Sequence, residues 1–324
     1  MEKIRIGIAG YGNVGRGIEK AVAAASDMEL RAVFTRRDPK ELKLIDDSVP
    51  VFTVDDAKKM TDEIDVMILG GGSATDLKQQ GPHFASLFSI VDSFDTHPLI
   101  PEYMASIDAV AKSTTAIISS GWDPGLFSMM RLLSQAILPD GESYTFWGRG
   151  VSQGHSDAIR HIAGVKKAVQ YTVPLESAVN EVRRGAKPKL DPGQKHKREC
   201  YVVALPDADL SAIEKEIKQM PYYFADYDTT VLFIEDEDFL ANHSKMPHGG
   251  MVLRSGNTGE NKQLIEFSLD LGSNPEFTGS IMTACARAAF RMAREKRFGA
   301  MTVFDVPLAY LSEKDRPALI KELL

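Results

Sequence analysis

The sequence has few cysteines, and they are not spaced as a disulfide framework or a metal site requires. Its two cysteines, Cys200 and Cys285, lie far apart, and no C-x-x-C or H-E-x-x-H pattern occurs in the 324 residues. Both thiols are therefore expected to be reduced, and no metal is expected. No apolar run reaches the ~20 residues of a membrane-spanning helix, and the N-terminus is typical of a strand rather than of a signal peptide. These absences predict a cytoplasmic protein without a membrane partner.

An excess of basic charge is absent as well. The sequence has 38 Lys and Arg against 45 Asp and Glu, which gives a formal net charge of −7. Proteins bind nucleic acids nonspecifically through positive charge, so nucleic-acid binding is not expected as the main function. No internal repeat or low-complexity tract is found, and the composition is ordinary for a globular protein. A chain of this length can form two or three domains with a large buried core.

The most informative feature that is present is a glycine-rich run near the N-terminus. The run Gly10, Tyr11, Gly12, Asn13, Val14 and Gly15 follows the apolar stretch Ile4–Ala9 and opens the helical pattern Val14–Ala25. A buried strand that turns through G-x-G-x-x-G into a helix is typical of a dinucleotide-binding site. Its glycines permit the tight turn and the close approach of the backbone, and the helix N-terminus faces the pyrophosphate. The alternative is an ordinary turn between a strand and a helix.

The residues after the second predicted strand indicate which dinucleotide binds. The stretch Glu29–Thr35 ends in Thr35, Arg36 and Arg37, where an NAD site usually has an acidic residue that holds the ribose 2′-OH. Guanidinium groups at this position attract a 2′-phosphate, often through two parallel hydrogen bonds, so the sequence predicts NADP rather than NAD. The alternative is a solvated basic loop.

Three further strands are expected to end at the coenzyme crevice, because ligands bind outside the carboxyl ends of parallel strands. They are Asp65–Leu69, Ser89–Asp92 and Ala116–Ser119. Coenzyme-binding candidates lie at or after these ends: Gly72, Ser73, Ala74 and Thr75; Asp92, Ser93 and Phe94; and Gly121, Trp122, Asp123, Pro124 and Gly125. The alternative for the triple glycine Gly70–Gly72 is a flexible loop, and the alternative for Asp123 is a helix N-cap.

The texture of the sequence changes after about residue 120. Residues 1–120 alternate strand and helix patterns, which predicts an α/β dinucleotide-binding (Rossmann) domain with a doubly wound parallel sheet. Residues 121–297 are expected to form a second, α+β domain on a mixed sheet that serves substrate binding and dimerisation, and residues 298–324 to pack back on the first domain. Enzymes of this plan commonly bind substrate in the cleft between domains.

Alternating and helical patterns divide the second region further. Strands are expected at Ser143–Trp147, Ala168–Val173, Arg198–Leu205, Thr229–Ile234, Met251–Arg254 and Leu264–Leu271. Helices are expected at Leu126–Leu138, Leu175–Arg184, Leu210–Gln219 and Thr278–Arg297. Linkers are expected near Gly121–Gly125 and in Gly185–Lys197, which is rich in Lys, Pro and Gly.

A dense group of glycine and polar residues lies at Phe146–Asp157. It contains a G-x-S-x-G pattern at Gly150–Gly154, which can mark the nucleophile of a hydrolase. Gly148 and Gly150 interrupt the hydrophobic strand that such a site needs, so a hydrolase is the weaker interpretation. Four polar residues elsewhere stand near the ends of predicted elements: Thr172, Arg198, His248 and Asn274. Taken alone, each is better explained by a structural role, such as a turn or a strand former, than by a functional one.

Several segments together closely resemble the meso-diaminopimelate dehydrogenase family, over nearly the whole length of the chain. They are Gly10–Gly15, Thr35–Arg37, Gly72–Asp76, Gly121–Gly125, Ser152–Asp157, Ala168–Thr172 and Met246–Gly250. The resemblance implies an NADP-dependent homodimer that oxidatively deaminates the D centre of meso-2,6-diaminopimelate. The products are L-2-amino-6-oxopimelate, which cyclises to tetrahydrodipicolinate, together with ammonia and NADPH. The reaction is reversible and serves the synthesis of lysine and peptidoglycan precursors.

The resemblance also implies roles for individual residues. Thr172, Arg198, His248 and Asn274 resemble the family's clamp for the distal, non-reacting L centre. For the reacting D centre, Asp92 and Asp123 are suited to face the amine, and either is a candidate general base. Trp122 and Trp147 are suited to wall the site, and backbone N–H groups near Gln153 and Gly154 to hold the reacting carboxylate.

Two other functions share part of this pattern. One is a different two-domain NADP-dependent oxidoreductase that acts on an aldehyde, a semialdehyde or a sugar. The other is a non-catalytic NADP-binding sensor. Neither explains why so many partners for carboxylate and ammonium groups occur in the second region.

Overall fold

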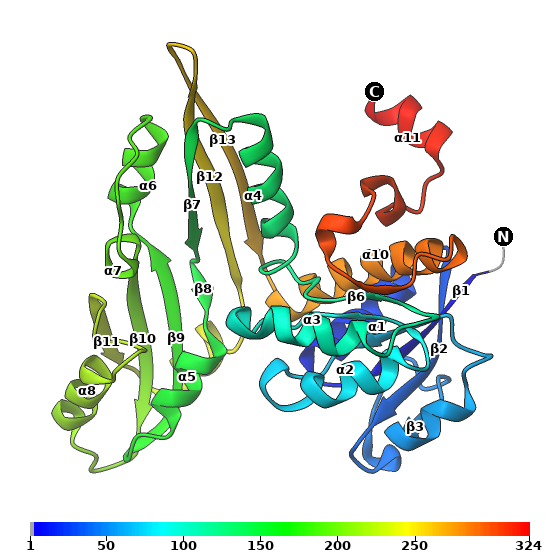
Figure 1. Cartoon of the computed structure of the whole chain (residues 1–324). Coiled ribbons are helices and arrows are strands. Elements are labelled where there is room, and N and C mark those ends of the chain that lie inside the picture. Colours follow the sequence, from blue (N-terminus) through cyan, green and yellow to red (C-terminus); the bar gives the residue numbers. More distant parts are fainter. Residues whose placement is uncertain (1–2) are drawn as a thin grey trace. The chain divides into compact units, whose positions relative to one another are not determined.

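The computed structural model describes residues 3–324, which form two compact units (Figure 1). Unit 1 contains the residues up to Met129 together with Pro275–Leu324, and unit 2 contains Met130–Asn274. The chain enters unit 2 within helix α4 (Leu126–Ile137) and leaves it at the start of helix α10 (Asn274–Arg294). The units thus place residues 121–129 and 275–297 with the N-terminal fold, whereas the sequence assigned them to the second region. The functional roles of the two regions stay predictions.

Unit 1 is built on a seven-stranded sheet in which every pair of neighbours is parallel. Its order is β14 (Gly299–Met301), β6 (Thr115–Ile117), β5 (Ser89–Asp92), β4 (Val66–Leu69), β1 (Ile4–Ala9), β2 (Met28–Thr35) and β3 (Val51–Thr53). The strand order reverses beside β1, which pairs with β2 on one side and with β4 on the other. Such a switch point is where doubly wound sheets bind ligands. The predicted fold class is confirmed.

Helices cover both faces of this sheet. One face packs against α1 (Asn13–Ala24) and α10, and the other against α2 (Lys78–Ala85) and α3 (Ile100–Asp108). Because both faces are covered, β4 and β5 are buried along their whole length, as parallel strands commonly are. Short helical segments and the terminal helix α11 (Arg316–Leu323) complete the unit. The short segments are η1 (Pro39–Glu41), η2 (Val54–Lys59), η3 (Ser73–Leu77), η4 (His97–Leu99), η5 (Val303–Asp305) and η6 (Leu308–Leu311).

Close packing between α1 and α10 explains why α10 belongs to unit 1. A Cβ atom on Gly17 would lie 2.6 Å from the Pro275 carbonyl oxygen, and one on Gly279 would lie 2.5 Å from the Gly17 carbonyl carbon. Only glycine permits so close a crossing. The helix ends at Arg294 rather than at the expected Arg297, because Lys296 adopts a left-handed φ of 60° that stops the helix.

Unit 2 contains two smaller sheets (Figure 1). The antiparallel three-stranded sheet has the order β13 (Asn261–Leu271), β12 (His248–Thr258) and β7 (Gly141–Trp147). The mixed four-stranded sheet has the order β11 (Thr229–Phe233), β10 (His196–Ala204), β9 (Val165–Pro174) and β8 (Gly150–Val151). The helices of this unit are α5 (Gln153–Arg160), α6 (Glu176–Arg183), α7 (Pro192–Lys195), α8 (Leu210–Gln219) and α9 (Asp236–Asn242).

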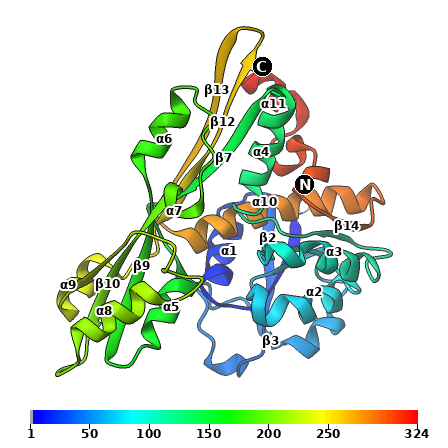
Figure 2. The ribbon, with the colours of Figure 1, turned by 60° about the vertical axis from the view of Figure 1, so that its left-hand side comes forward.

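The four-stranded sheet positions the candidate substrate-binding residues Thr172 and Arg198. Helices α5 and α8 lie on one of its faces, as Figure 2 shows, and share a core with Cys200 and Val202 of β10. Alternation along β10 puts His196 and Arg198 on this same buried face. The expected linker Gly185–Lys197 is structured at its end, where α7 leads directly into β10. Among residues 3–324, no helix is long and apolar enough to cross a bilayer.

Candidate active site

The glycine-rich run forms the turn between β1 and α1, as the motif predicts. Gly10 has a left-handed φ of 89°, and a Cβ on Gly15 would lie 2.4 Å from the Gly10 carbonyl oxygen. In contrast, a Cβ on Gly12 would have no atom within 4 Å, so the space in front of the first turn of α1 is open. This open cradle at a helix N-terminus fits a dinucleotide pyrophosphate.

The two predicted phosphate-binding arginines follow β2. The Arg37 backbone N–H donates to Thr35 Oγ1 at 3.1 Å, and Arg37 Nη2 donates to the Tyr11 carbonyl oxygen at 2.5 Å. Arg36 forms an ion pair with Asp76, whose carboxylate also accepts from the Gly72 N–H at 3.2 Å. The structure therefore brings the arginines, the glycine-rich turn and the segment Gly72–Asp76 together. Asp76 had no assigned role in the sequence, although it ends one of the segments that carry the family resemblance.

Asp92, predicted as a catalytic, substrate-binding and coenzyme-binding residue, lies in the core of unit 1. Its side chain is fully buried, and its carboxylate accepts from the Phe94 N–H at 2.9 Å, the Ser119 N–H at 3.0 Å and the Tyr103 hydroxyl at 2.7 Å. Burial raises the pKa of Asp92, while these hydrogen bonds favour the charged form. Both oxygens of this carboxylate accept hydrogen bonds, which link the end of β5 to the residues after β6 and to α3.

The loop after β6 holds the remaining candidates of unit 1. Gly121 and Gly125 form a bridge across it, and a Cβ on Gly121 would lie 3.6 Å from Ser93 Cβ. Trp122 is 8% exposed and meets Phe127 edge to face, with ring centroids 5.3 Å apart. Asp123 is half-buried in the same loop, followed by Pro124. Ser93 and this loop are therefore neighbours, as the ends of adjacent parallel strands should be, and Asp123 is the less enclosed of the two aspartates.

In unit 2 the predicted clamp residues line up across the four-stranded sheet. Thr172 of β9 is paired with Gly150 of β8 on one side and with Arg198 of β10 on the other. Arg198 Nη1 donates to Thr172 Oγ1. The imidazole of His248 lies against Gly150, where a Cβ would be 2.4 Å from its Cγ. The structure thus gathers Thr172, Arg198 and His248 from three distant stretches of sequence.

Two further predicted residues lie next to this row. Gln153, at the N-terminus of α5, donates through Nε2 to Met246 Sδ at 3.2 Å, and the Asn274 N–H donates to the Met246 carbonyl oxygen at 2.9 Å. Trp147 lies at the end of β7, and its ring is stacked on His196 with ring centroids 5.5 Å apart. The backbone N–H of Trp147 donates to His196 Nε2 at 2.8 Å. His196 was missed in the sequence because its supporting contact is with a residue nearly fifty positions away.

Arg198 has an unusual charge environment. It is 7% exposed, its Nε has no hydrogen-bond partner, and among the described residues no carboxylate forms an ion pair with it. Burial lowers the pKa of Arg198, and burial together with the Arg198 charge lowers the pKa values of His155 and His196 to about 4. A buried cation without a counter-ion is costly, and an anionic ligand would relieve that cost.

The G-x-S-x-G pattern forms the turn from β8 into α5. Ser152 Oγ lies 2.7 Å from His155 Nδ1, and His155 packs edge to face on Tyr223 and Phe224. Aromatic rings surround His155, and none of residues 3–324 offers its imidazole a carboxylate. The arrangement therefore lacks the acid that orients the histidine of a hydrolase triad. The α5 N-terminus, with Gln153 and Gly154, offers backbone N–H groups that suit a carboxylate.

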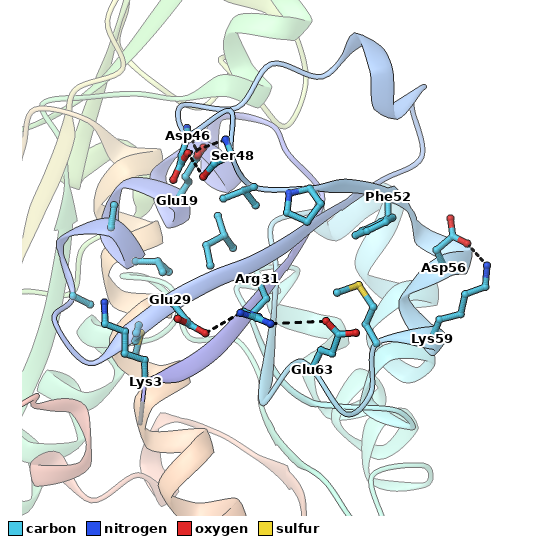
Figure 3. A pocket seen from close by; sticks show the side chains of 18 residues that line it. Lys3, Glu19, Glu29, Arg31, Asp46, Ser48, Phe52, Asp56, Lys59 and Glu63 are labelled. Carbon is cyan, nitrogen blue, oxygen red and sulfur yellow. Dashed lines mark hydrogen bonds and ion pairs between the residues drawn. The ribbon is translucent and has the colours of Figure 1, made fainter. Parts of the chain in front are cut away.

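A cavity of about 850 Å³ in unit 1 lies apart from all of these candidates. It follows the outer edge of β2 at Met28–Arg31, where β3 pairs only with the later residues of the strand. Figure 3 shows ion pairs between residues that line the cavity, from Arg31 to Glu29 at 3.3 Å and from Arg31 to Glu63 at 4.0 Å. Charged side chains of this kind protect an exposed sheet edge from pairing with other chains. Within residues 3–324, no cluster of His, Cys, Asp or Glu side chains is placed to hold a metal ion.

Comparison with known proteins identifies the family. The model of the diaminopimelic acid dehydrogenase C-terminal domain matches residues 121–273. The meso-diaminopimelate D-dehydrogenase of Ureibacillus thermosphaericus is 59% identical over 327 residues, which covers 100% of both chains. The chain belongs to the meso-diaminopimelate D-dehydrogenase family. The resemblance predicted from the sequence is therefore confirmed.

Solved structures of this dehydrogenase family agree with the fold. The Corynebacterium glutamicum diaminopimelate dehydrogenase in complex with diaminopimelate is 44% identical, with a TM-score of 0.90 and 100% of both chains covered. An engineered D-amino acid dehydrogenase bound to NADP+ is 42% identical, with a TM-score of 0.85, covering 99% of this chain and 100% of the other. The bound NADP+ of that relative agrees with the coenzyme predicted from Arg36 and Arg37.

Proposed function

We propose that this protein is an NADP-dependent dehydrogenase that oxidatively deaminates the D centre of meso-2,6-diaminopimelate, reversibly. The products are L-2-amino-6-oxopimelate, which cyclises to tetrahydrodipicolinate, with ammonia and NADPH. The observation that carries the proposal is the buried guanidinium of Arg198 beside Thr172, which forms no ion pair with a carboxylate of residues 3–324, in a member of this family. A substrate with a second carboxylate supplies the missing counter-ion, whereas an aldehyde substrate or a mere sensor gives no reason for it.

Binding of the distal L centre is assigned to unit 2. Arg198 presents a planar fork that suits a carboxylate, and the Thr172 hydroxyl is held beside it. His248 adds a donor from the adjacent row, and Asn274 is placed near Met246 to bind the distal amine. The backbone N–H groups of Gln153 and Gly154 bind the reacting carboxylate. Holding the inert end in this way orients the two near-identical ends of the substrate.

Coenzyme binding is assigned to unit 1. The turn Gly10–Gly15 holds the pyrophosphate, and Arg36 and Arg37 hold the 2′-phosphate. The segments Gly72–Thr75, Ser93–Phe94 and Gly121–Gly125 follow the ends of β4, β5 and β6 and line the same edge of the sheet. A coenzyme held by these residues would supply the hydride acceptor for the reaction at the substrate Cα.

Proton transfer is assigned to Asp123. Loss of a hydride requires a neutral amine, whose lone pair drives formation of the imine, and a carboxylate can accept the proton and then help water to attack. Asp123 is preferred to Asp92 for this role because the Asp92 carboxylate is buried and already accepts three hydrogen bonds. Trp122 and Trp147 limit the access of water, and positioning of the substrate contributes a further part of the rate.

The protein is also proposed to act as a cytoplasmic homodimer in the synthesis of lysine and cell-wall precursors, without a nucleic-acid or membrane partner. Helix α4 supports a contact with a second copy, because Leu132, Leu133 and Ile137 are 47%, 49% and 65% exposed. Large apolar side chains in such a group on one helix are typical of an interface. Sedimentation at micromolar concentration tests this assignment.

The activity test uses both stereoisomers of the substrate. With NADP+ at alkaline pH, meso-diaminopimelate is expected to give NADPH, measured by its absorbance, whereas L,L-diaminopimelate is expected to give none. Exchanging hydrogen and side chain at the reacting carbon, while carboxylate and amine stay bound, turns the hydrogen away from the nicotinamide. Turnover of both isomers would contradict the assigned orientation, and turnover of neither would contradict the function.

A second prediction concerns the coenzyme. Replacing Arg36 and Arg37 together by Ala is expected to lower kcat/KM with NADP+ roughly 10- to 100-fold, because charge-assisted hydrogen bonds to the 2′-phosphate are lost at a partly exposed site. NAD+ kinetics should change little, and Lys40→Ala provides a control for the general loss of positive charge. Equal losses with both coenzymes, or equal efficiency of the unaltered protein with both, would argue against this assignment.

A further inference from the structure

An unpaired guanidinium must be held in one orientation if it is to act as a preformed anion site. Arg198 Nη1 donates to Thr172 Oγ1, and among residues 3–324 the Arg198 Nε has no hydrogen-bond partner. The bond to Thr172 alone would leave the fork free to rotate about its long, flexible stem. Tyr227 gives a second contact, because the Arg198 Cζ lies 3.9 Å from the centroid of the Tyr227 ring and the Tyr227 hydroxyl is also a hydrogen-bond partner of the guanidinium.

The position of Tyr227 is set by the backbone around it. The Tyr227 N–H donates to the Phe224 carbonyl oxygen at 3.0 Å, and its own carbonyl oxygen accepts from Thr229 Oγ1 at 3.2 Å. The carbonyl oxygen of the next residue, Asp228, accepts from the backbone N–H of Arg198 at 2.8 Å. The segment that carries the Tyr227 ring is therefore hydrogen-bonded to strand β10, which carries the guanidinium, and this bond keeps the ring close to the cation.

We propose that Tyr227 is a positioning residue that supports the guanidinium of Arg198 for a distal carboxylate, a role that rests on the proposed function. An aromatic face attracts a cation without accepting its N–H groups in the plane of the fork. Asp or Glu in the same place would neutralise Arg198 and occupy the donors that the substrate needs. The ring thus stabilises a buried cation in the free protein and leaves its hydrogen-bonding edge available for the ligand.

This role predicts which substrates depend on Tyr227. A molecule with a carboxylate at its distal end should bind more weakly once the ring is removed. Binding of NADP+ and the chemical step at the D centre should be unaffected, because Tyr227 contacts neither in this assignment. A loss confined to KM for the dicarboxylate is therefore the expected signature, and a general loss of folding would not produce it.

The experiment compares three variants of the full-length protein. Tyr227→Leu removes the aromatic face, Tyr227→Phe keeps the face and removes the hydroxyl, and Tyr222→Leu is the control, since Tyr222 lies in the same loop and is 94% exposed. For Tyr227→Leu we expect the KM for meso-diaminopimelate to rise about 5- to 30-fold, with kcat within about twofold of the unaltered protein. The inhibition constant of pimelate, a dicarboxylate without amines, should rise in parallel. Tyr227→Phe should remain within about threefold of the unaltered protein.

The outcomes separate this inference from the proposed function. A KM unchanged in Tyr227→Leu but raised in Arg198→Met would overturn the role of Tyr227 and leave the function standing. A KM unchanged in both would overturn the assignment of Arg198 itself. Equal losses in Tyr227→Phe and Tyr227→Leu would also overturn the role, because they would show that the hydroxyl and not the aromatic face supports Arg198. Parallel losses in kcat, melting temperature and NADP+ affinity would overturn it as well, because they would indicate a general structural effect.

Discussion

Replacing Asp123 with Asn is expected to lower kcat for meso-diaminopimelate by about 100- to 10,000-fold, the range that general acid–base catalysis contributes. The amide keeps the size of the side chain but cannot accept a proton. The KM for the substrate and the affinity for NADP+ should change much less than kcat. Steady-state kinetics in the direction of oxidation, followed through NADPH absorbance, give all three values.

Asp92, the other aspartate at the end of a strand of the parallel sheet, is expected to respond differently when it is replaced. Asp92→Ala should instead reduce stability, because three buried donors lose their acceptor, which costs roughly 1–3 kcal/mol for each unpaired group. A kcat of Asp123→Asn within about threefold of the unaltered protein would show that positioning alone accounts for the rate.

Replacing Arg198 with Ala is expected to raise the KM for meso-diaminopimelate by roughly 30- to 1,000-fold, or about 2–4 kcal/mol, since a buried charged contact to the distal carboxylate is lost. The kcat at saturation should fall much less, because the reacting end keeps its own contacts. The same variant should relax the requirement for a distal carboxylate, so the ratio of kcat/KM between meso-diaminopimelate and a simple D-amino acid should fall. A change in KM of less than twofold would show that Arg198 is no anchor.

Stability should move in the opposite direction to substrate binding. In the ligand-free protein Arg198 is a buried cation without a carboxylate partner, so an apolar side chain of similar length removes a desolvation cost. Arg198→Met is therefore expected to melt at the same temperature as the unaltered protein or at a higher one, without substrate. A lower melting temperature would indicate that Arg198 is mainly structural. Such an exchange of stability for function is common at binding sites.

Some of the site was readable from the sequence because its geometry is local. The turn Gly10–Gly15 needs only the strand before it and the helix after it, and all three are contiguous in the chain. Arg36 and Arg37 follow the next strand directly, so the switch point of the sheet places them at the same edge. The resemblance of longer segments then indicated the substrate class, which composition and spacing could not have supplied.

The burial of Asp92 and the contacts of His196 and Tyr227 could not be predicted in the same way. Asp92 stands at a strand end, where a catalytic carboxylate is plausible, but Ser119 and Tyr103 reach it from other elements and enclose it. His196 gains its role through Trp147, and Tyr227 through Arg198, although the members of each pair lie on different strands or loops. Alternation along a strand indicates which face a residue takes, but not which residue of another strand it meets.

The coenzyme-binding turn, the α/β character of the N-terminal region and the family membership all follow from the amino-acid sequence alone. The packing of α10 into unit 1 through Gly17 and Gly279 emerges only in the folded chain, and so does the burial of the Arg198 cation without a counter-ion among residues 3–324. The difference lies in the range of the forces involved. Backbone turns are set by a few consecutive residues, whereas desolvation and the pairing of charges depend on side chains that the chain brings together from distant positions.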